Sequence, residues 1–209
     1  MIVLALDTCL GACSAAVVDD GRVLGRALEP MTRGHQERLA PMVREVMAAA
    51  GLPFSSLDRI GVTVGPGSFT GLRVGLAFAK GLALALDRPC IGVGALDALA
   101  ATLGSDGAVA AAIDSGRGQI YLQSFRGGEA LTAPSVMSLD EARATLNALG
   151  GGVLTGPGAS LLAEGLAGFQ IAELAVADPA AIARLAAAAP VAPPRPLYLR
   201  PPDAKPKAA

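Results

Sequence analysis

The pattern of the chain repeats itself at an offset of 107 residues. One apolar run ends at Asp7 and a second ends at Asp114. Asp7 is followed 13 residues later by the turn residue Asp20, and Asp114 is followed 13 residues later by the turn residue Gly127. Both copies therefore indicate strands joined by a tight hairpin turn. A repeat at a fixed offset predicts two similar lobes.

A Gly-Pro-Gly sequence follows an apolar strand in both halves, beginning at Gly65 and at Gly156. Each precedes a segment that we expect to be helical, so the chain follows a duplicated β-β-β-α-β-α plan of the α/β class. Pro41 lies inside the first predicted helix and should bend it. The predicted strands are 1–6, 13–18, 22–28, 60–64, 90–93, 108–113 and 119–125, and the predicted helices are 33–50, 72–86 and 139–149.

The sequence divides into three parts. Residues 1–103 form the first predicted lobe, and residues 104–189 form a second lobe whose pattern is weaker. Residues 190–209 form a Pro-rich tail that cannot be helical. Within the tail we expect the apolar segment 197–199 to dock on the body. The basic residues of the tail are Arg195, Arg200, Lys205 and Lys207.

The charge balance argues against an autonomous nucleic-acid binder. The chain has 17 basic and 18 acidic residues, which gives a formal net charge of −1. Such a chain lacks the positive field that neutralises phosphates, so any contact with RNA must be local or shared with a partner. The three Cys residues have no CxxC spacing and there is one His, which suits a reducing cytosol better than a zinc site.

Hydropathy does not predict a membrane protein. Ala and Gly raise the mean hydropathy of +0.50, and the apolar run 74–86 is shorter than the roughly 20 residues that a membrane helix needs. The segment 10–13 resembles a lipoprotein cleavage box. However, Asp7 interrupts the preceding apolar run and no basic residue precedes it, so we expect a strand instead of a signal peptide.

The most distinctive motif is GPGSFTGLRVG, which spans residues 65–75. A glycine-rich loop that leads into a helix could hold a phosphate. The P-loop pattern is not met, because no Lys stands beside the loop. We favour packing: Ser68 or Thr70 caps the helix, and Gly71 and Gly75 let another helix approach closely.

Two acidic residues end matched strands. Asp7 with Thr8, and Asp114 in the second lobe, could flank a magnesium nucleotide in a cleft between the lobes. The alternative is that each carboxylate caps its own turn, which Asp does in many proteins. His35 is the only His; Leu39 occupies the i+4 position where a two-His metal site on a helix would place its second ligand. We therefore expect His35 to be a surface residue at a helix N-terminus.

Several segments resemble the TsaB (YeaZ) family: ALDT at 5–8, GHQERL at 34–39, GPGSFTGLRVG at 65–75 and PLYLR at 196–200. The resemblance covers the whole chain and implies the duplicated actin-like ATPase fold, with two RNase H-like lobes. It also implies a cytoplasmic, non-catalytic subunit in the synthesis of threonylcarbamoyladenosine beside the tRNA anticodon. The expected partners are TsaD in a heterodimer and TsaE, with tRNA bound only in the complex, and a homodimer forms in isolation.

The resemblance also implies where partners bind. The catalytic paralogue TsaD holds its metal through the two His residues of an HxxxH helix. This chain has His35 at the first of these positions and Leu39 at the second. ATP and metal are thus expected in the assembled complex and not in this chain alone. The two helices after His35 and Gly71 are expected to pack on the partner, and Gly75→Leu should abolish pairing without harming the fold. The expected interface residues are His35, Arg38, Leu39, Met42, Gly71, Leu72, Gly75, Leu76 and Ala79.

Two positions depart from the family pattern. Cys9 stands where Ser is more common, and Gln119 stands where Glu is common, so a nucleotide in this cleft is not firmly expected. The alternative functions are an independent ATP-dependent phosphotransferase, which would use Asp7 and Asp114, and a peptidase, for which the sequence shows no site. The basic tail is a candidate tRNA contact within the complex.

Overall fold

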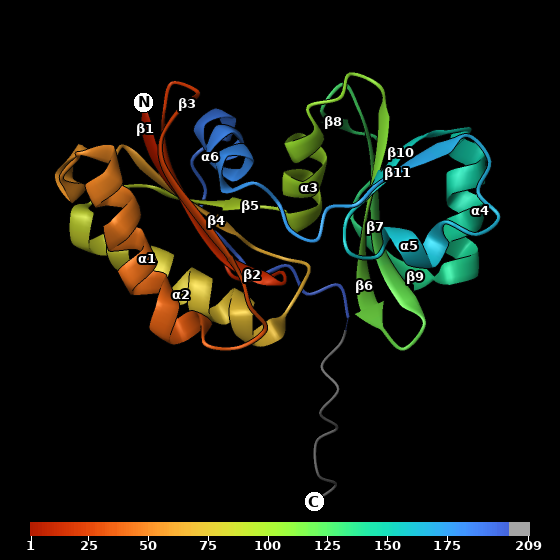
Figure 1. Ribbon diagram of the computed structural model, residues 1–209, viewed down its shortest axis with the longest axis horizontal. Helices are drawn as coiled ribbons and strands as arrows, with labels where there is room; N and C mark the ends of the chain where they lie inside the picture. The colour runs from red at the N-terminus through yellow and green to blue at the C-terminus, as the bar shows by residue number, and fades with distance from the viewer. Residues whose placement is uncertain (201–209) are drawn as a thin grey trace, which may run out of the picture.

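The computed structural model describes residues 1–200 and contains two sheets with the same strand order (Figure 1). The first sheet has the order β3-β2-β1-β4-β5. Strands β1 and β2 pair antiparallel and β1 and β4 pair parallel, as the predicted hairpin and crossover require. The strands of the first sheet are β1 (Ile2–Asp7), β2 (Ala12–Asp19), β3 (Arg22–Pro30), β4 (Arg59–Thr63) and β5 (Cys90–Val93).

The second sheet repeats this topology with the order β8-β7-β6-β10-β11, and β9 pairs with β7 beside this path. The β6–β7 hairpin is antiparallel and β6 pairs parallel with β10, as β1 does with β4. The duplication is therefore confirmed. The strands are β6 (Ala108–Gly116), β7 (Gln119–Arg126), β8 (Glu129–Ala130), β9 (Ser135–Ser138), β10 (Gly152–Thr155) and β11 (Phe169–Ala172).

Helices cover both faces of each sheet (Figure 1). Helices α1 and α2 lie on one face of the first sheet and α6 lies on the other. On the second sheet, α3 covers the face towards the first lobe, and α4 and α5 cover the outer face. The helices are α1 (His35–Ala50), α2 (Phe69–Leu86), α3 (Ala95–Leu103), α4 (Leu139–Leu149), α5 (Ala159–Leu162) and α6 (Pro179–Ala188), with a 3-10 turn, η1 (Phe54–Ser56).

The last helix of each half packs on the other half's sheet. Helix α3 follows β5 but contacts β6 and β7, whereas α6 follows β11 but contacts β1, β2 and β4. The two helices also contact each other. A continuous apolar core joins both sheets through them. The expected division into 1–103 and 104–189 assigns α3 to the first lobe and α6 to the second, whereas each packs on the sheet of the other lobe. Sequence periodicity identifies a helix but does not say which sheet buries it.

Local signals set the helix ends. The Ser68 hydroxyl accepts a hydrogen bond from the Gly71 N–H at 3.2 Å, so α2 begins three residues before the predicted start. Ser138 and Glu141 form a capping box at α4. Helix α1 continues across Pro41 as one helix. Helix α2 is, by length and composition alone, long and apolar enough to cross a membrane; this had not been expected from the shorter run 74–86.

The segment 190–200, which we call the strap, lies across the first lobe after α6. The Leu197 N–H donates to the Val64 carbonyl oxygen at 2.7 Å, so the predicted docking of segment 197–199 is confirmed. The Arg200 Nη1 donates to the Ser115 carbonyl oxygen in the second lobe at 2.6 Å. Lys205 and Lys207 of the predicted basic cluster lie outside the described residues.

Candidate functional site

The small residues of α2 face the chain's own sheet. The Thr8 hydroxyl, at the end of β1, donates a hydrogen bond to the Gly71 carbonyl oxygen at 2.7 Å. A Cβ at position 71 would stand 1.9 Å from the Thr8 carbonyl oxygen. A Cβ at Gly75 would stand 2.6 Å from Thr8 Oγ1 and 3.5 Å from Val62 Cγ2. The glycines of the GPGSFTGLRVG motif therefore pack α2 closely against β1 and β4.

This packing overturns one expectation from the sequence. Gly75→Leu was expected to block pairing while leaving the fold intact, yet a side chain at this position would collide with Thr8 inside the lobe. Such a collision forces backbone shifts in a close-packed core. A loss of pairing in this variant would therefore report damage to the fold and would not identify an interface.

The expected interface residues lie mostly on the inner side of the two helices. Only Leu39 of the expected set also lines the groove described below. His35 is the first residue of α1, as predicted, but it is buried and is not a surface residue. The buried members of the set are His35, Leu39, Met42, Gly71, Leu72, Gly75, Leu76 and Ala79.

Arg38 is the remaining member of that set, and the chain's own carboxylates engage it. Its Nε and Nη2 donate to Glu29 on β3 at 2.8 and 2.5 Å, and Nη1 and Nη2 donate to Glu45 on α1 at 2.9 and 2.6 Å. These bonds to Arg38 hold the pKa of both glutamates below their usual range and raise the pKa of the guanidinium. Arg38 therefore joins α1 to β3.

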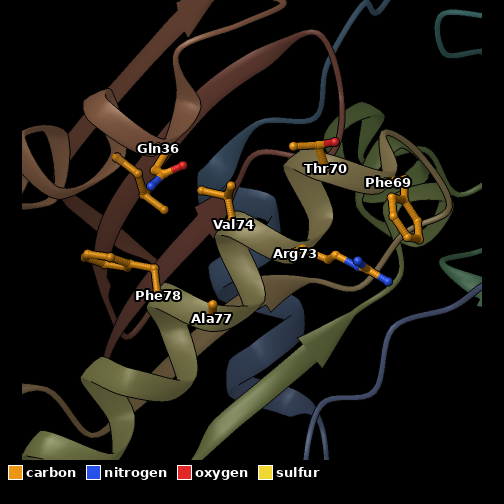
Figure 2. Close-up of a pocket in the computed structure, with 8 residues that line it drawn as sticks. Gln36, Phe69, Thr70, Arg73, Val74, Ala77 and Phe78 are labelled. Carbon is orange, nitrogen blue, oxygen red and sulfur yellow. The ribbon is translucent and has the colours of Figure 1, made fainter.

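A groove with a volume of about 510 Å³ lies between α1 and α2 on the outer side (Figure 2). Its wall is mostly apolar. We call this the helix-pair groove. Figure 2 shows Gln36 on α1 facing Val74 and Phe78 on α2, with Phe69 and Arg73 at the N-terminal end of α2. The groove residues are Gln36, Leu39, Phe69, Thr70, Arg73, Val74, Ala77 and Phe78.

The outer face of α2 continues beyond the groove. Leu84 is 85% exposed and Phe69 is 54% exposed, which is unusual for large apolar side chains on one helix. Arg73 and Lys80 are the charged residues of α2, and the helix contains no Asp or Glu. The guanidinium of Arg73 lies over the Phe69 ring, 3.8 Å from its centroid. The face is thus apolar with positive charges at two positions.

A second hollow, the inter-lobe cleft, has a volume of about 450 Å³. Asp114 lines it and is exposed, whereas Asp7 is fully buried and does not line it. The structure therefore does not present both acids to one cleft. The cleft residues are Cys9, Leu10, Gly11, Met31, Thr32, His35, Gly67, Ser68, Ile113, Asp114, Ser115, Gly116, Tyr121 and Pro157.

Both acids bond to the backbone two residues further along the chain. The Cys9 N–H donates to Asp7 Oδ1 at 2.9 Å, and the Gly116 N–H donates to Asp114 Oδ1 at 2.7 Å. The Thr63 hydroxyl also donates to Asp7 Oδ1, at 2.5 Å. Asp7 Oδ2 is buried and has no hydrogen-bond partner within residues 1–200. The alternative that each Asp caps its own turn is therefore observed at both positions.

The remaining reactive groups are dispersed. Among residues 1–200 the structure contains no group of three or more His, Cys, Asp and Glu side chains that could hold a metal ion. The three Cys residues are free. Burial raises the pKa of Cys13 and of Cys90 to about 11, and it raises the pKa of Cys9 well above its ordinary value. These thiols are not activated nucleophiles.

Sequence reasoning did not single out the outer residues Phe69, Arg73, Ala77 and Phe78. Small and apolar residues surround α2 on every side, so its periodicity does not distinguish the buried face from the exposed one. The usable signal was Arg73, because an unpaired basic side chain is costly to bury against a sheet and therefore marks the exposed side of the helix. Of the two family departures, Cys9 lies in the wall of the inter-lobe cleft and Gln119 does not line it.

The chain is similar to proteins of threonylcarbamoyladenosine synthesis. The family model for TsaD, tRNA N6-adenosine threonylcarbamoyltransferase, matches residues 28–154, more than half of the chain. TsaB of Escherichia coli, a tRNA threonylcarbamoyladenosine biosynthesis protein, is 38% identical over 132 residues, which cover 62% of this chain and 57% of that protein. An uncharacterized protein of Mycobacterium tuberculosis is 36% identical over 215 residues, covering 99% of this chain and 95% of the relative.

A solved structure extends the similarity to the whole fold. YeaZ from Pseudomonas aeruginosa has a TM-score of 0.79 and 30% sequence identity to the chain, and the match covers 89% of this chain and 90% of that one. The strand order of the two sheets agrees with the expected duplicated actin-like ATPase fold. The chain belongs to the TsaB (YeaZ) family.

Proposed function

We propose that the chain is a non-catalytic subunit in tRNA threonylcarbamoyladenosine biosynthesis, and that it binds a TsaD-type paralogue through the helix-pair groove. The name of its E. coli relative supports the pathway, and the match to the TsaD family model supports a partner of similar fold. TsaE would join this pair, and tRNA would bind only to the assembly. Without TsaD, the same face would pair two copies of the chain in an isologous homodimer.

The observation that carries the proposal is the exposed apolar face of α2. The helix buries Gly71, Leu72, Gly75, Leu76, Ala79 and Ala83, whereas Phe69 and Leu84 are more than half exposed on its other side. An apolar groove with large exposed apolar side chains beside it is typical of an interaction surface. A helix pair from a partner would cover this face with ordinary helix packing.

Two features support a non-catalytic role. Leu39 stands at the position of the second ligand in the metal-binding helix of the catalytic paralogue, and Leu39 is buried. Asp7 is buried against Thr63 and the Cys9 backbone, so it faces neither a metal nor a nucleotide in the inter-lobe cleft. ATP and metal would then be handled by the other subunits of the complex.

The experiment is light scattering after size-exclusion chromatography, with the chain alone and mixed with TsaD from the same source. Ala77→Arg introduces a long charged side chain at an exposed position in the groove. Ala144→Arg is the matched control, because Ala144 is exposed on α4 of the second lobe. We expect the heterodimer with the control and its loss with Ala77→Arg. Unchanged pairing in Ala77→Arg would reject the helix-pair groove as the interface.

A second candidate is an ATP-dependent phosphotransferase that acts in the inter-lobe cleft. It is favoured by the volume of the cleft and by Asp114, Ser115 and His35 in its wall. Calorimetric titration of the isolated chain with magnesium ATP tests it. Tight binding that is lost in Asp114→Ala would favour the phosphotransferase over the subunit role.

A further inference from the structure

The strap is fixed to the first lobe at successive points. Arg59 Nη1 donates to the carbonyl oxygens of Ala186, Ala187 and Ala189 at 3.1, 3.2 and 2.7 Å, so it holds the end of α6 where the strap begins. Pro194 is buried and packs on Gly92 of the edge strand β5, where a Cβ would stand 3.2 Å from Pro194 Cβ.

Two further contacts fix the end of the strap. The Leu197 N–H donates to the Val64 carbonyl oxygen, just after β4. Arg200 then reaches the second lobe, where it donates to the Ser115 carbonyl oxygen. Ser115 belongs to the wall of the inter-lobe cleft. The strap is therefore held from both lobes, with Tyr198 between the two anchors.

These anchors place Tyr198 at the end of the helix-pair groove. The Tyr198 ring lies against the Phe69 ring with the centroids 5.6 Å apart and an angle of 39° between the planes. Phe69 and Arg73 both line the groove, and the Arg73 guanidinium lies over Phe69. Tyr198 remains 49% exposed, so a partner in the groove could reach it without moving the strap.

The chemistry of this patch restricts its occupant. Neither α2 nor the strap contains an Asp or Glu, the Arg73 guanidinium lies over the Phe69 ring, and the strap carries Arg195 and Arg200 on either side of Tyr198 in the sequence. Tyr and Arg in a partly exposed cluster are typical of the residues that contribute most to protein interfaces. A matching surface would present apolar side chains with at least one carboxylate beside them.

We propose that Tyr198, which lies against Phe69, extends the helix-pair groove into a larger contact surface for the same partner, and that Arg200 positions Tyr198 from the second lobe. The inference rests on the proposed function, since it assigns a further contact to the same partner. It makes partner binding depend on the strap and on the second lobe, and not on α1 and α2 alone.

The test is the Kd of the chain for TsaD, measured by calorimetry on full-length variants. Tyr198→Ala should raise Kd about tenfold, which is the effect of losing one strong interface residue. Val191→Ala is the control, because Val191 is 63% exposed and lies on the same strap seven residues before Tyr198. The control should leave Kd within about twofold, since scattered surface substitutions have small effects.

Arg200→Gln tests whether Arg200 positions Tyr198, separately from the contact that Tyr198 itself makes with the partner. It removes the bond to Ser115 and keeps the Tyr198 side chain in the chain. We expect it to raise Kd less than Tyr198→Ala does and to speed hydrogen exchange at the Leu197 amide. Unchanged exchange at that amide would overturn the positioning role of Arg200.

The outcomes distinguish this inference from the proposed function. If Ala77→Arg abolishes binding and Tyr198→Ala leaves Kd unchanged, the strap contact is wrong and the groove stands. If Ala77→Arg is also without effect, the proposed interface itself fails. If Tyr198→Ala leaves Kd for TsaD unchanged but weakens tRNA binding by the complex, the patch contacts RNA and the protein contact is overturned.

Discussion

Thr8 and Gly71 are held together by a hydrogen bond and by a close steric contact. The Thr8 hydroxyl donates to the Gly71 carbonyl oxygen at 2.7 Å, and the Thr8 carbonyl oxygen occupies the space that a Cβ at position 71 would need. The first turn of α2 is thus locked onto the end of β1. The glycine-rich motif serves close packing here, so its presence does not require a bound phosphate.

Gly71→Ala should therefore destabilise the chain, because the new Cβ would stand 1.9 Å from the Thr8 carbonyl oxygen. Overpacking of this kind costs about 1–3 kcal/mol. In a chain of this size 1 kcal/mol lowers Tm by about 2–4 °C, so we expect Tm to fall by about 2–12 °C in thermal unfolding followed by circular dichroism. The control is Gly81→Ala on the same helix, where a Cβ meets nothing within 4 Å. It should raise stability by about 0.5–1 kcal/mol, and equal losses in both variants would contradict the packing account.

The Arg38 network should make stability depend on acid pH. The pKa of Glu29 and of Glu45 is lowered by hydrogen bonds from Arg38, so their contribution is present above the ordinary Glu pKa near 4.5. It is lost as pH falls through the lower folded pKa values. Arg38→Met should reduce Tm slightly at pH 7, and its Tm should fall less than that of the unmodified chain as the pH drops below 4.5. If Tm falls equally with pH in both proteins, the network contributes nothing to acid stability.

The thiols should react slowly in the folded chain. With a pKa of about 11, Cys13 and Cys90 are about one part in a thousand thiolate at pH 8. A colorimetric disulfide reagent should detect three thiols quickly in urea and only slowly in buffer. Because the folded pKa values are raised, the protonated thiols favour the folded state below pH 9, and this contribution disappears as pH rises through 11. Rapid native labelling at pH 8 would contradict the burial of these groups.

Asp7 and Asp114 should differ when they are truncated. Asp7→Ala leaves the Cys9 N–H and the Thr63 hydroxyl without their acceptor in a buried site, at a cost of about 1–3 kcal/mol. Asp114→Ala removes one bond at an exposed turn and should change stability by about 0.5 kcal/mol or less. Urea unfolding compares the two variants. Equal effects would mean that the two acids have the same role after all.

The duplication was predictable because each copy carries its own turn residues at matched spacing. Asp7 and Asp114 end corresponding strands, and Gly65 and Gly156 both have positive φ, at 95° and 98°. The exchange of α3 and α6 between sheets was not predictable. Both helices are rich in Ala, and such a helix fits against either sheet with similar packing.

The groove lies on the two helices that the family resemblance implied, but most of its lining residues were not among those expected. The expected set included Gly75 and Ala79, which face inwards, whereas Phe69 and Arg73 line the groove. What decides the orientation of α2 is the lack of space beside Thr8, a contact between residues 63 positions apart. Sequence periodicity does not contain that information when a helix is apolar on all sides.

The most direct test of the account is the stoichiometry of the chain with TsaD from the same source, measured by light scattering after size-exclusion chromatography. The account predicts that a self-associated chain converts into a one-to-one heterodimer, and that Ala77→Arg prevents this while Ala144→Arg does not. If the chain keeps its own oligomeric state in the presence of equimolar TsaD, the partner role is contradicted, and the inter-lobe cleft beside Asp114 becomes the site to test for an independent activity.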